Sequence, residues 1–189
     1  MNRATTRLAT ACAIGLALLA TGCAGSDTAG TPKPVDVDRP ASPSAPTISS
    51  SVREASALTD LAPCDLLTSD DVGRLGLRHP GKEDSVGGIK TCNWYGTGDG
   101  AASAGIHPDD GADDLNLDGE HTATTKIGEY DAIRVEAPAN AKYVCYVVIS
   151  TSATSSVQVI GTVKATSTDT SAACERATKA AELIAPKLP

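Results

Sequence analysis

Four cysteines, Cys64, Cys92, Cys145 and Cys174, constrain the fold of this chain more than any other feature. The chain has no phenylalanine and one tryptophan, so its core must be made of small aliphatic side chains and needs further support. An even number of cysteines in an exported domain predicts two disulfides, each contributing about 3–4 kcal/mol in the chain-entropy model.

Three pairings of these cysteines are open, and the sequence alone does not choose among them. We favour Cys64 with Cys92 and Cys145 with Cys174, because each pair would join a flanking helix to a strand. Zinc is the competing interpretation, but no two of the four cysteines have the spacing of a Cys-x-x-Cys knuckle. The pattern therefore indicates a domain held by disulfides.

The start of the chain has the pattern of a lipoprotein signal peptide. Arg3 and Arg7 precede an apolar run that ends at Ala20 and is too short to span a bilayer, which takes about 20 apolar residues. Cys23 follows as in a bacterial lipoprotein box, although Ala20 stands where leucine is usual. An ordinary cleaved signal is the alternative. We favour lipidation, because a thiol at this position has little other purpose. Acylation would anchor Cys23 to the outer face of the cell membrane, and each methylene group of the acyl chains that enters the bilayer would stabilise the attachment by about 0.8 kcal/mol.

The segment after Cys23 is expected to be a tether. It is rich in Ser, Thr, Pro and Ala, and this composition cannot bury enough apolar surface to offset the entropy of ordering. Its prolines favour extended, solvated chain. The chain is thus expected to divide into a lipoprotein signal peptide at 1–22, a lipidated cysteine with a disordered tether at 23–57, and a globular domain at 58–189.

The charge of the processed chain excludes two classes of partner. Removing Arg3 and Arg7 from the 16 basic residues leaves 14 against 23 acidic residues, a formal net charge of −9. Such a surface repels nucleic-acid phosphates and anionic lipid headgroups. We therefore expect no nucleic-acid partner, and attachment to the membrane should depend on the lipid anchor.

Hydrophobic periodicity predicts an α+β domain. A helical element is expected over 58–77, with Thr68 and Asp71 forming a capping box, and an alanine-rich helix is expected over 170–185. The expected strands are 89–95, 101–107, 122–127, 130–137, 142–152 and 156–163. The predicted fold is an antiparallel sheet of five to six strands, with a short N-terminal helix and a C-terminal helix packed on it, stapled by two disulfides.

Several short motifs carry a family resemblance. They are Pro63-Cys64-Asp65-Leu66-Leu67-Thr68, Cys92-Asn93-Trp94, Gly128-Glu129-Tyr130-Asp131-Ala132, Cys145 in an apolar strand and Cys174 in an alanine-rich helix. In their order and spacing the chain resembles a family of actinobacterial secreted lipoproteins catalogued as domain of unknown function 3558. The resemblance covers residues from about 58 to the C-terminus, with the lipoprotein box and linker before them. It implies a lipoprotein of a Gram-positive, high-GC envelope and no known activity.

The sharpest local motif is acidic. Asp114, Asn116 and Asp118, followed by Gly119, match the first ligand positions of an EF-hand calcium loop. The twelfth position is Thr125 instead of a bidentate glutamate, and ordinary exposed turns use the same residue types. We therefore treat these residues as a weak calcium candidate and expect no metal or other cofactor.

No catalytic motif occurs in the sequence. His79, His107 and His121 have no neighbours at metal-ligand spacing and are expected at exposed loops or strand ends. Nucleophile elbows, zinc-protease helices and phosphate-binding glycine loops are missing. We expect a protein that is not an enzyme. A hydrolase whose Ser, His and Asp meet only in space is the lesser alternative.

Three aromatic residues are candidates for a binding surface, namely Trp94, Tyr95 and Tyr130. Trp94 and Tyr95 lie on opposite faces of one expected strand, and core packing beside Cys92 is the favoured role of Trp94. The leading hypothesis is a non-enzymatic envelope lipoprotein that binds another envelope component, a protein first of all. The alternative is a carrier or sensor of a small apolar or lipidic ligand, which needs an apolar pocket of about 300–1,000 Å³.

Substitution of the anchoring cysteine tests the expected location. Cys23→Ala should release the domain from the membrane or leave the signal peptide uncleaved, because surface charge supplies no second membrane signal. Membrane fractionation followed by mass determination of the N-terminus measures both outcomes. A cleaved Cys23→Ala protein that still sediments with membranes would refute the expectation.

Overall fold

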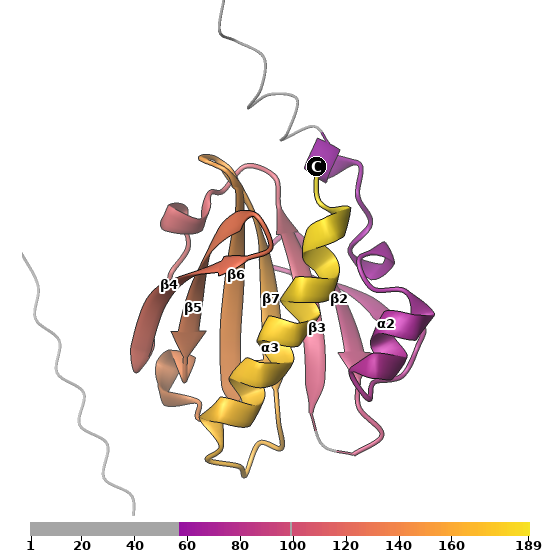
Figure 1. Ribbon diagram of the computed structural model, residues 1–189, viewed down its shortest axis with the longest axis vertical. Helices are drawn as coiled ribbons and strands as arrows, with labels where there is room; N and C mark the ends of the chain where they lie inside the picture. The colour runs from indigo at the N-terminus through magenta and orange to yellow at the C-terminus, as the bar shows by residue number, and fades with distance from the viewer. Residues whose placement is uncertain (1–56, 99) are drawn as a thin grey trace, which may run out of the picture. The chain divides into compact units, whose positions relative to one another are not determined.

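One antiparallel sheet of seven strands organises the fold, which the computed structural model describes for residues 57–98 and 100–189 (Figure 1). The strand order is β1-β2-β3-β7-β6-β5-β4, so β1 and β4 are the edges. All neighbouring strands pair antiparallel. The strand bounds are β1 Lys82–Val86, β2 Ile89–Tyr95, β3 Ala101–His107, β4 His121–Ile127, β5 Tyr130–Glu136, β6 Val144–Ser152 and β7 Ser155–Thr162.

The sheet has seven strands, and the five to six expected from the sequence were too few. The missed strand is β1, which pairs with β2 from Lys82 opposite Asn93 to Val86 opposite Ile89. All five residues of β1 are exposed, so it shows no alternation of buried and exposed side chains. An edge strand without a buried face leaves no hydrophobic period in the sequence, which is why the pattern did not reveal it.

Helix α3, Thr170–Ile184, packs diagonally across one face of the sheet over β6 and β7 (Figure 1). The Asp169 side chain caps it by accepting a backbone N–H of the first turn at 3.0 Å. Its buried residues are mostly alanines. Gly161 of β7 lies beneath them, and a Cβ there would come within 2.5 Å of the Ala173 oxygen and the Ala177 nitrogen. A core that contains no phenylalanine, and in the described residues one fully buried aromatic side chain, Trp94, is thus filled in part by bringing helix and strand backbones close together.

The segment before the sheet holds short helical elements. The helical element expected over 58–77 is divided into a 3-10 turn, η1 (Pro63–Asp65), and a six-residue helix, α2 (Ser69–Arg74). At the start of α2, the Thr68 hydroxyl accepts the Asp71 N–H at 3.2 Å, and the Asp71 carboxylate accepts the Thr68 N–H at 3.1 Å. In the described part of the chain, no helix has the length and apolarity to cross a membrane. The other 3-10 turns are η2 Ala112–Asp114, η3 Pro138–Asn140 and η4 Ala185–Lys187.

Two disulfides join the helical segments to the sheet. Cys64–Cys92 links η1 to β2, and Cys145–Cys174 links β6 to α3. These are the pairs favoured from the sequence. Their sequence separations of 28 and 29 residues are nearly equal, so the chain-entropy model assigns each a similar stabilisation of about 3–4 kcal/mol.

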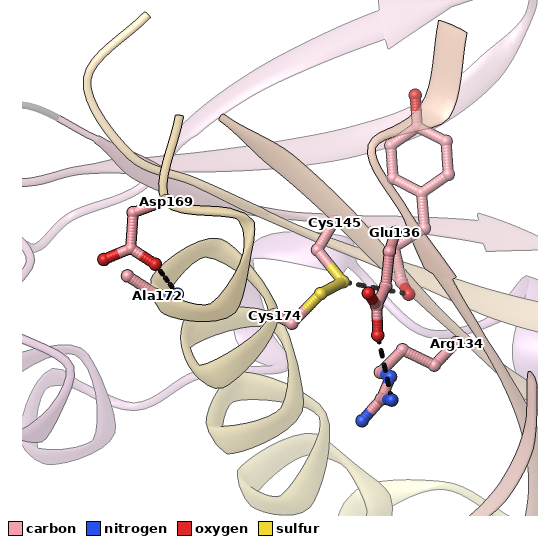
Figure 2. The surroundings of a disulfide bond; sticks show 7 residues. Arg134, Glu136, Cys145, Asp169, Ala172 and Cys174 are labelled. Atoms are coloured by element: carbon pink, nitrogen blue, oxygen red, sulfur yellow. Dashed lines mark hydrogen bonds and ion pairs between the residues drawn. A yellow bond between two sulfur atoms is a disulfide. The ribbon is translucent and has the colours of Figure 1, made fainter. Parts of the chain in front are cut away.

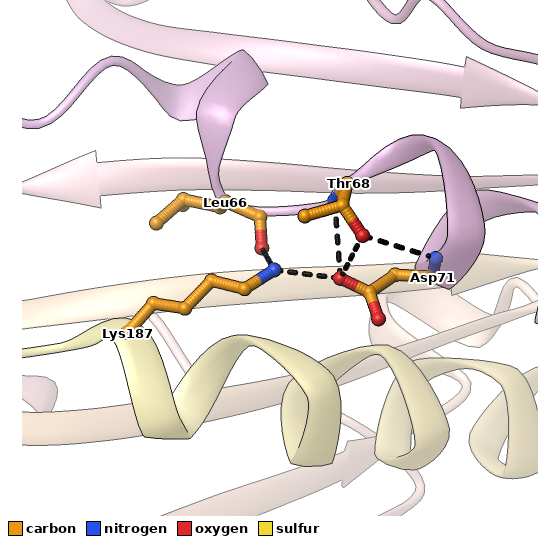
Figure 3. A network of polar contacts seen from close by, with 4 residues as sticks. All are labelled: Leu66, Thr68, Asp71 and Lys187. Atoms are coloured by element: carbon orange, nitrogen blue, oxygen red, sulfur yellow. Dashed lines mark hydrogen bonds and ion pairs between the residues drawn. The ribbon is translucent and has the colours of Figure 1, made fainter.

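An ion pair fastens the C-terminus to the α2 segment (Figure 3). The Lys187 ammonium donates to the Asp71 carboxylate at 2.7 Å and to the Leu66 carbonyl oxygen at 2.6 Å. The same carboxylate oxygen accepts from the Thr68 hydroxyl at 2.7 Å. Asp71 is only 9% exposed. The hydrogen bond from Lys187 lowers the pKa of Asp71 to about 2, with help from Thr68 and against the effect of burial.

Acid should weaken the fold through Asp71. Because its folded pKa lies below its ordinary value of 3.8, its stabilisation is complete above that value and is lost as pH falls through about 2. We expect a loss of about 2 kcal/mol in unfolding free energy, measured by urea unfolding from about pH 5 to pH 2. Asp71→Asn should remove this loss, whereas Asp70→Asn, which deletes an exposed carboxylate from the same turn, should keep it. Equal profiles for wild type and Asp71→Asn would contradict the assignment.

Candidate functional site

The face of the sheet opposite α3 carries the candidate site. On β2, β3 and β7, the side chains that alternate with those facing α3 point to this second face. The cross-strand register places Thr91, Gly105 and Gln158 in one row across it. The loop between β3 and β4 covers the neighbouring part of the face, because η2 contacts β6 and Gly119 lies against the Val135 side chain of β5. The part over β2, β3 and β7 stays uncovered by any helix among the described residues.

A hollow of about 250 Å³ lies on this uncovered part, and we call it the open-face hollow. Gly105 forms part of its floor, since a Cβ there would lie 3.3 Å from the Thr91 methyl carbon and 3.6 Å from a methyl carbon of Ile89. These two methyl groups would crowd a side chain at position 105, so the glycine keeps the floor of the hollow at the level of the sheet. No charged residue lines the hollow. Its polar side chains are Thr91, Asn93, Ser103, His107 and Gln158, and its larger apolar ones are Val86, Ile89 and Ile160.

His107, at the end of β3, is the titratable group of the open-face hollow. It is 8% exposed, and its Nδ1 forms no hydrogen bond with a described residue. The nearest carboxylate oxygen, Oδ2 of Asp110, lies 3.9 Å from Nδ1. Burial lowers the pKa of His107, and the negative charge of Asp110 opposes that shift. His107 lies at a strand end, as expected, but the expectation of exposure was wrong, because pairing with β7 continues as far as His107 opposite Ser156 and encloses the ring.

Other polar groups of the hollow also have unused hydrogen-bonding capacity. The Thr91 hydroxyl is buried and has no partner in the described part of the chain. Asn93 Oδ1 accepts from the Ser103 hydroxyl at 2.6 Å, which leaves the Asn93 N–H groups for another acceptor. The Thr91 hydroxyl and His107 Nδ1 are themselves closed off from solvent. The polar side chains that line the hollow and can offer hydrogen bonds to water or a ligand are therefore those of Asn93 and Gln158.

The residues around His107 do not supply an accessible nucleophile. Ser156, its cross-strand neighbour, is fully buried, and its hydroxyl donates to the Asp110 carbonyl oxygen at 2.9 Å. The 3.9 Å between His107 and the Asp110 carboxylate exceeds hydrogen-bond range. This Ser, His and Asp therefore lie close together without the geometry that activates a serine.

The aromatic candidates separate in the structure. Trp94 is fully buried on the α3 side of β2 beside Cys92, and the Tyr130 hydroxyl donates toward the Leu188 carbonyl oxygen at 3.2 Å, against the C-terminus. Tyr95 is 47% exposed and lies on the open face. The residues of the open-face hollow were not singled out from the sequence. The signal that could have found them is the lack of charge at positions alternating with Cys92 and Trp94.

The calcium candidates form local turns. An oxygen of Asp114 accepts the Gly111 N–H at 3.0 Å, and Oδ1 of Asn116 accepts the Asp118 N–H at 3.1 Å. Among the residues that the structure describes, no three His, Cys, Asp or Glu side chains gather into a group that could hold a metal ion. The lipidation candidate, Cys23, lies outside the described residues.

A second groove, of about 540 Å³, lies between α3 and β5 beside the Cys145–Cys174 disulfide (Figure 2). Arg134 and Glu136 of β5 line it, and Figure 2 shows them as an ion pair, with 2.9 Å between guanidinium and carboxylate. Their charges compensate each other within the protein. Arg134 Nε is buried without a partner in the described part of the chain, so unpartnered groups do not distinguish the two sites. The open-face hollow differs in having no charged lining residue, and we take it as the stronger candidate on that ground.

The protonation of His107 tests the description of the hollow. His107 should titrate below its ordinary pKa of 6.5, because burial disfavours the imidazolium more than Asp110 favours it. Asp110→Asn should lower the pKa further by removing the compensating charge, and NMR of the ring protons measures both. The unfolded chain binds a proton on the His107 imidazole more tightly than the folded chain does, so the unfolding free energy should fall as pH drops below 6.5. A His107 pKa at or above 6.5 would contradict the burial.

Comparison with known proteins assigns the family. The family model described as "Protein of unknown function (DUF3558)" matches residues 18–187, nearly the whole chain. No curated protein and no solved structure matches the chain.

Proposed function

The chain belongs to the DUF3558 family, and we propose that it is an extracytoplasmic lipoprotein whose domain is a non-catalytic binding module. The observation that carries the proposal is the open-face hollow, an uncharged concavity over β2, β3 and β7 that is lined by the polar side chains of Asn93, Ser103 and Gln158. Binding another component of the cell envelope would give these side chains hydrogen-bond partners and cover the exposed face.

The extracytoplasmic location is supported by the disulfides. Cys64–Cys92 and Cys145–Cys174 each hold a helical segment to the sheet, and such bonds persist in oxidising compartments. The family match begins at residue 18, so it includes Cys23 and the small residues before it. Membrane attachment through a lipid on Cys23 remains our proposal, and it agrees with the basic and apolar pattern that precedes this cysteine.

Two other functions are supported less well. A carrier of an apolar or lipidic ligand needs a pocket of about 300–1,000 Å³. The apolar hollow beside Leu58, Leu61 and Ile106 measures about 200 Å³, and the open-face hollow about 250 Å³. A hydrolase needs an accessible nucleophile, and Ser156 is buried and already bonded. Binding without catalysis is the function that these residues support best.

Photo-crosslinking on intact cells tests whether the open face binds. A benzophenone amino acid replaces Tyr95, which is 47% exposed on that face, and in a matched control it replaces Lys179, whose side chain is 59% exposed on α3. The probe at position 95 should give several times more covalent adduct than the probe at position 179, because only the first lies beside the hollow. Digestion of the adduct by protease or glycosidase identifies the class of the bound component.

Equal adduct at the two positions, or none at position 95, would count against the open face as the binding surface. Both proteins must remain folded and membrane-attached for the comparison, which unfolding curves and membrane fractionation establish. Benzophenone reacts with C–H bonds, so proteins, lipids and glycans are all within reach of the test.

A further inference from the structure

The geometry points to a neutral saccharide as the ligand of the open-face hollow, with one sugar ring seated over Gly105 between Ile89 and Ile160. This inference rests on the proposed function, since it names the chemical class that the open face binds. Four features of the hollow support it, namely its charge, its polar groups, its size and the pairing of the strands beneath it.

Charge excludes ionised ligands. Charged residues make up 21% of the chain, yet the side chains of β2, β3 and β7 that point to the open face include none. The adjacent edge strand β1 carries Lys82 opposite Asn93 and Asp84 opposite Thr91 on the same face, and these two opposite charges do not line the hollow. An anion or cation seated in the hollow itself would lose hydration without a charged lining residue to compensate, which is costly. The Asp110 carboxylate, 3.9 Å from His107, does not line the hollow either. The favoured ligand therefore has no net charge.

The polar groups exclude a purely apolar ligand. Such a ligand would cover the Asn93 N–H groups and the Gln158 carboxamide without giving them hydrogen-bond partners. A sugar hydroxyl donates one hydrogen bond and accepts others, so it can pair with a hydroxyl, an amide or an imidazole alike. Neutral side chains of these three kinds around one hollow match a ligand that carries several hydroxyl groups.

Size and shape agree with a single ring. The hollow of about 250 Å³ lies below the range of drug-sized ligand pockets, about 300–1,000 Å³. Gly105 lets a ligand approach the sheet, because a Cβ there would already contact Thr91 at 3.3 Å. Ile89 and Ile160 flank it with apolar surface, on which the C–H face of a sugar ring can pack while its hydroxyl groups point to the polar rim.

The position within the sheet disfavours an extended peptide. A peptide that binds by strand addition needs an edge with unpaired backbone groups. β2, β3 and β7 each pair with two neighbours, so the three strands under the hollow are internal. The edge strand β1 contributes only Val86 to the lining. Recognition over β2, β3 and β7 therefore relies on side chains, which suits a small hydroxylated ligand.

Saturation-transfer NMR on the intact lipoprotein in lipid nanodiscs tests the inference. The probes are methyl α-glucoside, methyl β-galactoside, methyl α-arabinofuranoside and N-acetylglucosamine, with glucuronate and glucosamine as charged analogues. At least one neutral probe should receive saturation with a dissociation constant in the range of about 1–10 mM, as single-ring ligands commonly show. The charged analogues should bind at least about tenfold more weakly, because the hollow offers no counter-charge.

Two variants locate the binding. Gly105→Leu fills the hollow and should weaken binding by at least about tenfold, whereas Gly73→Leu, at a glycine with open space around it, should leave binding unchanged. If Gly105→Leu fails to fold, Gln158→Ala serves instead. It removes one polar partner from the rim and should weaken binding by about three- to tenfold.

Three results would overturn the inference. They are no saturation of any neutral probe at about 50 mM, equal binding of charged and neutral probes, and undiminished binding by a folded Gly105→Leu protein. If no saccharide binds while the photoprobe at Tyr95 captures a protein, the saccharide is wrong and the binding module stands. If the photoprobe captures nothing and no probe binds, both proposals fall.

Discussion

The close approach of α3 to β7 is the packing contact on which the rest of the structure depends. Gly161 has no room for a Cβ beneath Ala173 and Ala177, so helix and strand meet with almost nothing but backbone and alanine between them. This arrangement compensates for a core without phenylalanine, because it gains density from proximity and not from large side chains. The Cys145–Cys174 disulfide holds the same two elements covalently.

A single long helix cannot cover both faces of a seven-stranded sheet, and the functional proposal follows from that limit. Two glycines show the difference between the faces. A Cβ at Gly161 would collide with α3 within 2.5 Å, whereas a Cβ at Gly105 would meet the methyl group of its cross-strand partner Thr91 at 3.3 Å. The first glycine admits an element of the fold. On our account, the second forms the floor on which a ligand from outside meets the polar side chains of Asn93 and Gln158.

The sequence was most informative where the signal is local. The alanine stripe predicted α3, and Thr68 with Asp71 predicted the cap of α2, because capping and helical periodicity depend on residues three or four apart. Strand β1 was not predicted because none of its side chains is buried. The open-face hollow was not predicted because β3 meets β7 only in space, some fifty residues later, so the burial of His107 depends on a long-range register.

Accessibility of the open face in living cells tests the central claim most directly. Val86→Cys, at a hollow-lining position where the native side chain is 65% exposed, can be compared with Glu175→Cys, at a position 64% exposed on α3. The rate of reaction with a membrane-impermeant maleimide is measured for each, on purified protein and on intact cells. Our account predicts that the envelope slows labelling at position 86 relative to position 175. Equal slowing at both positions would show that the open face is unoccupied and would contradict the account.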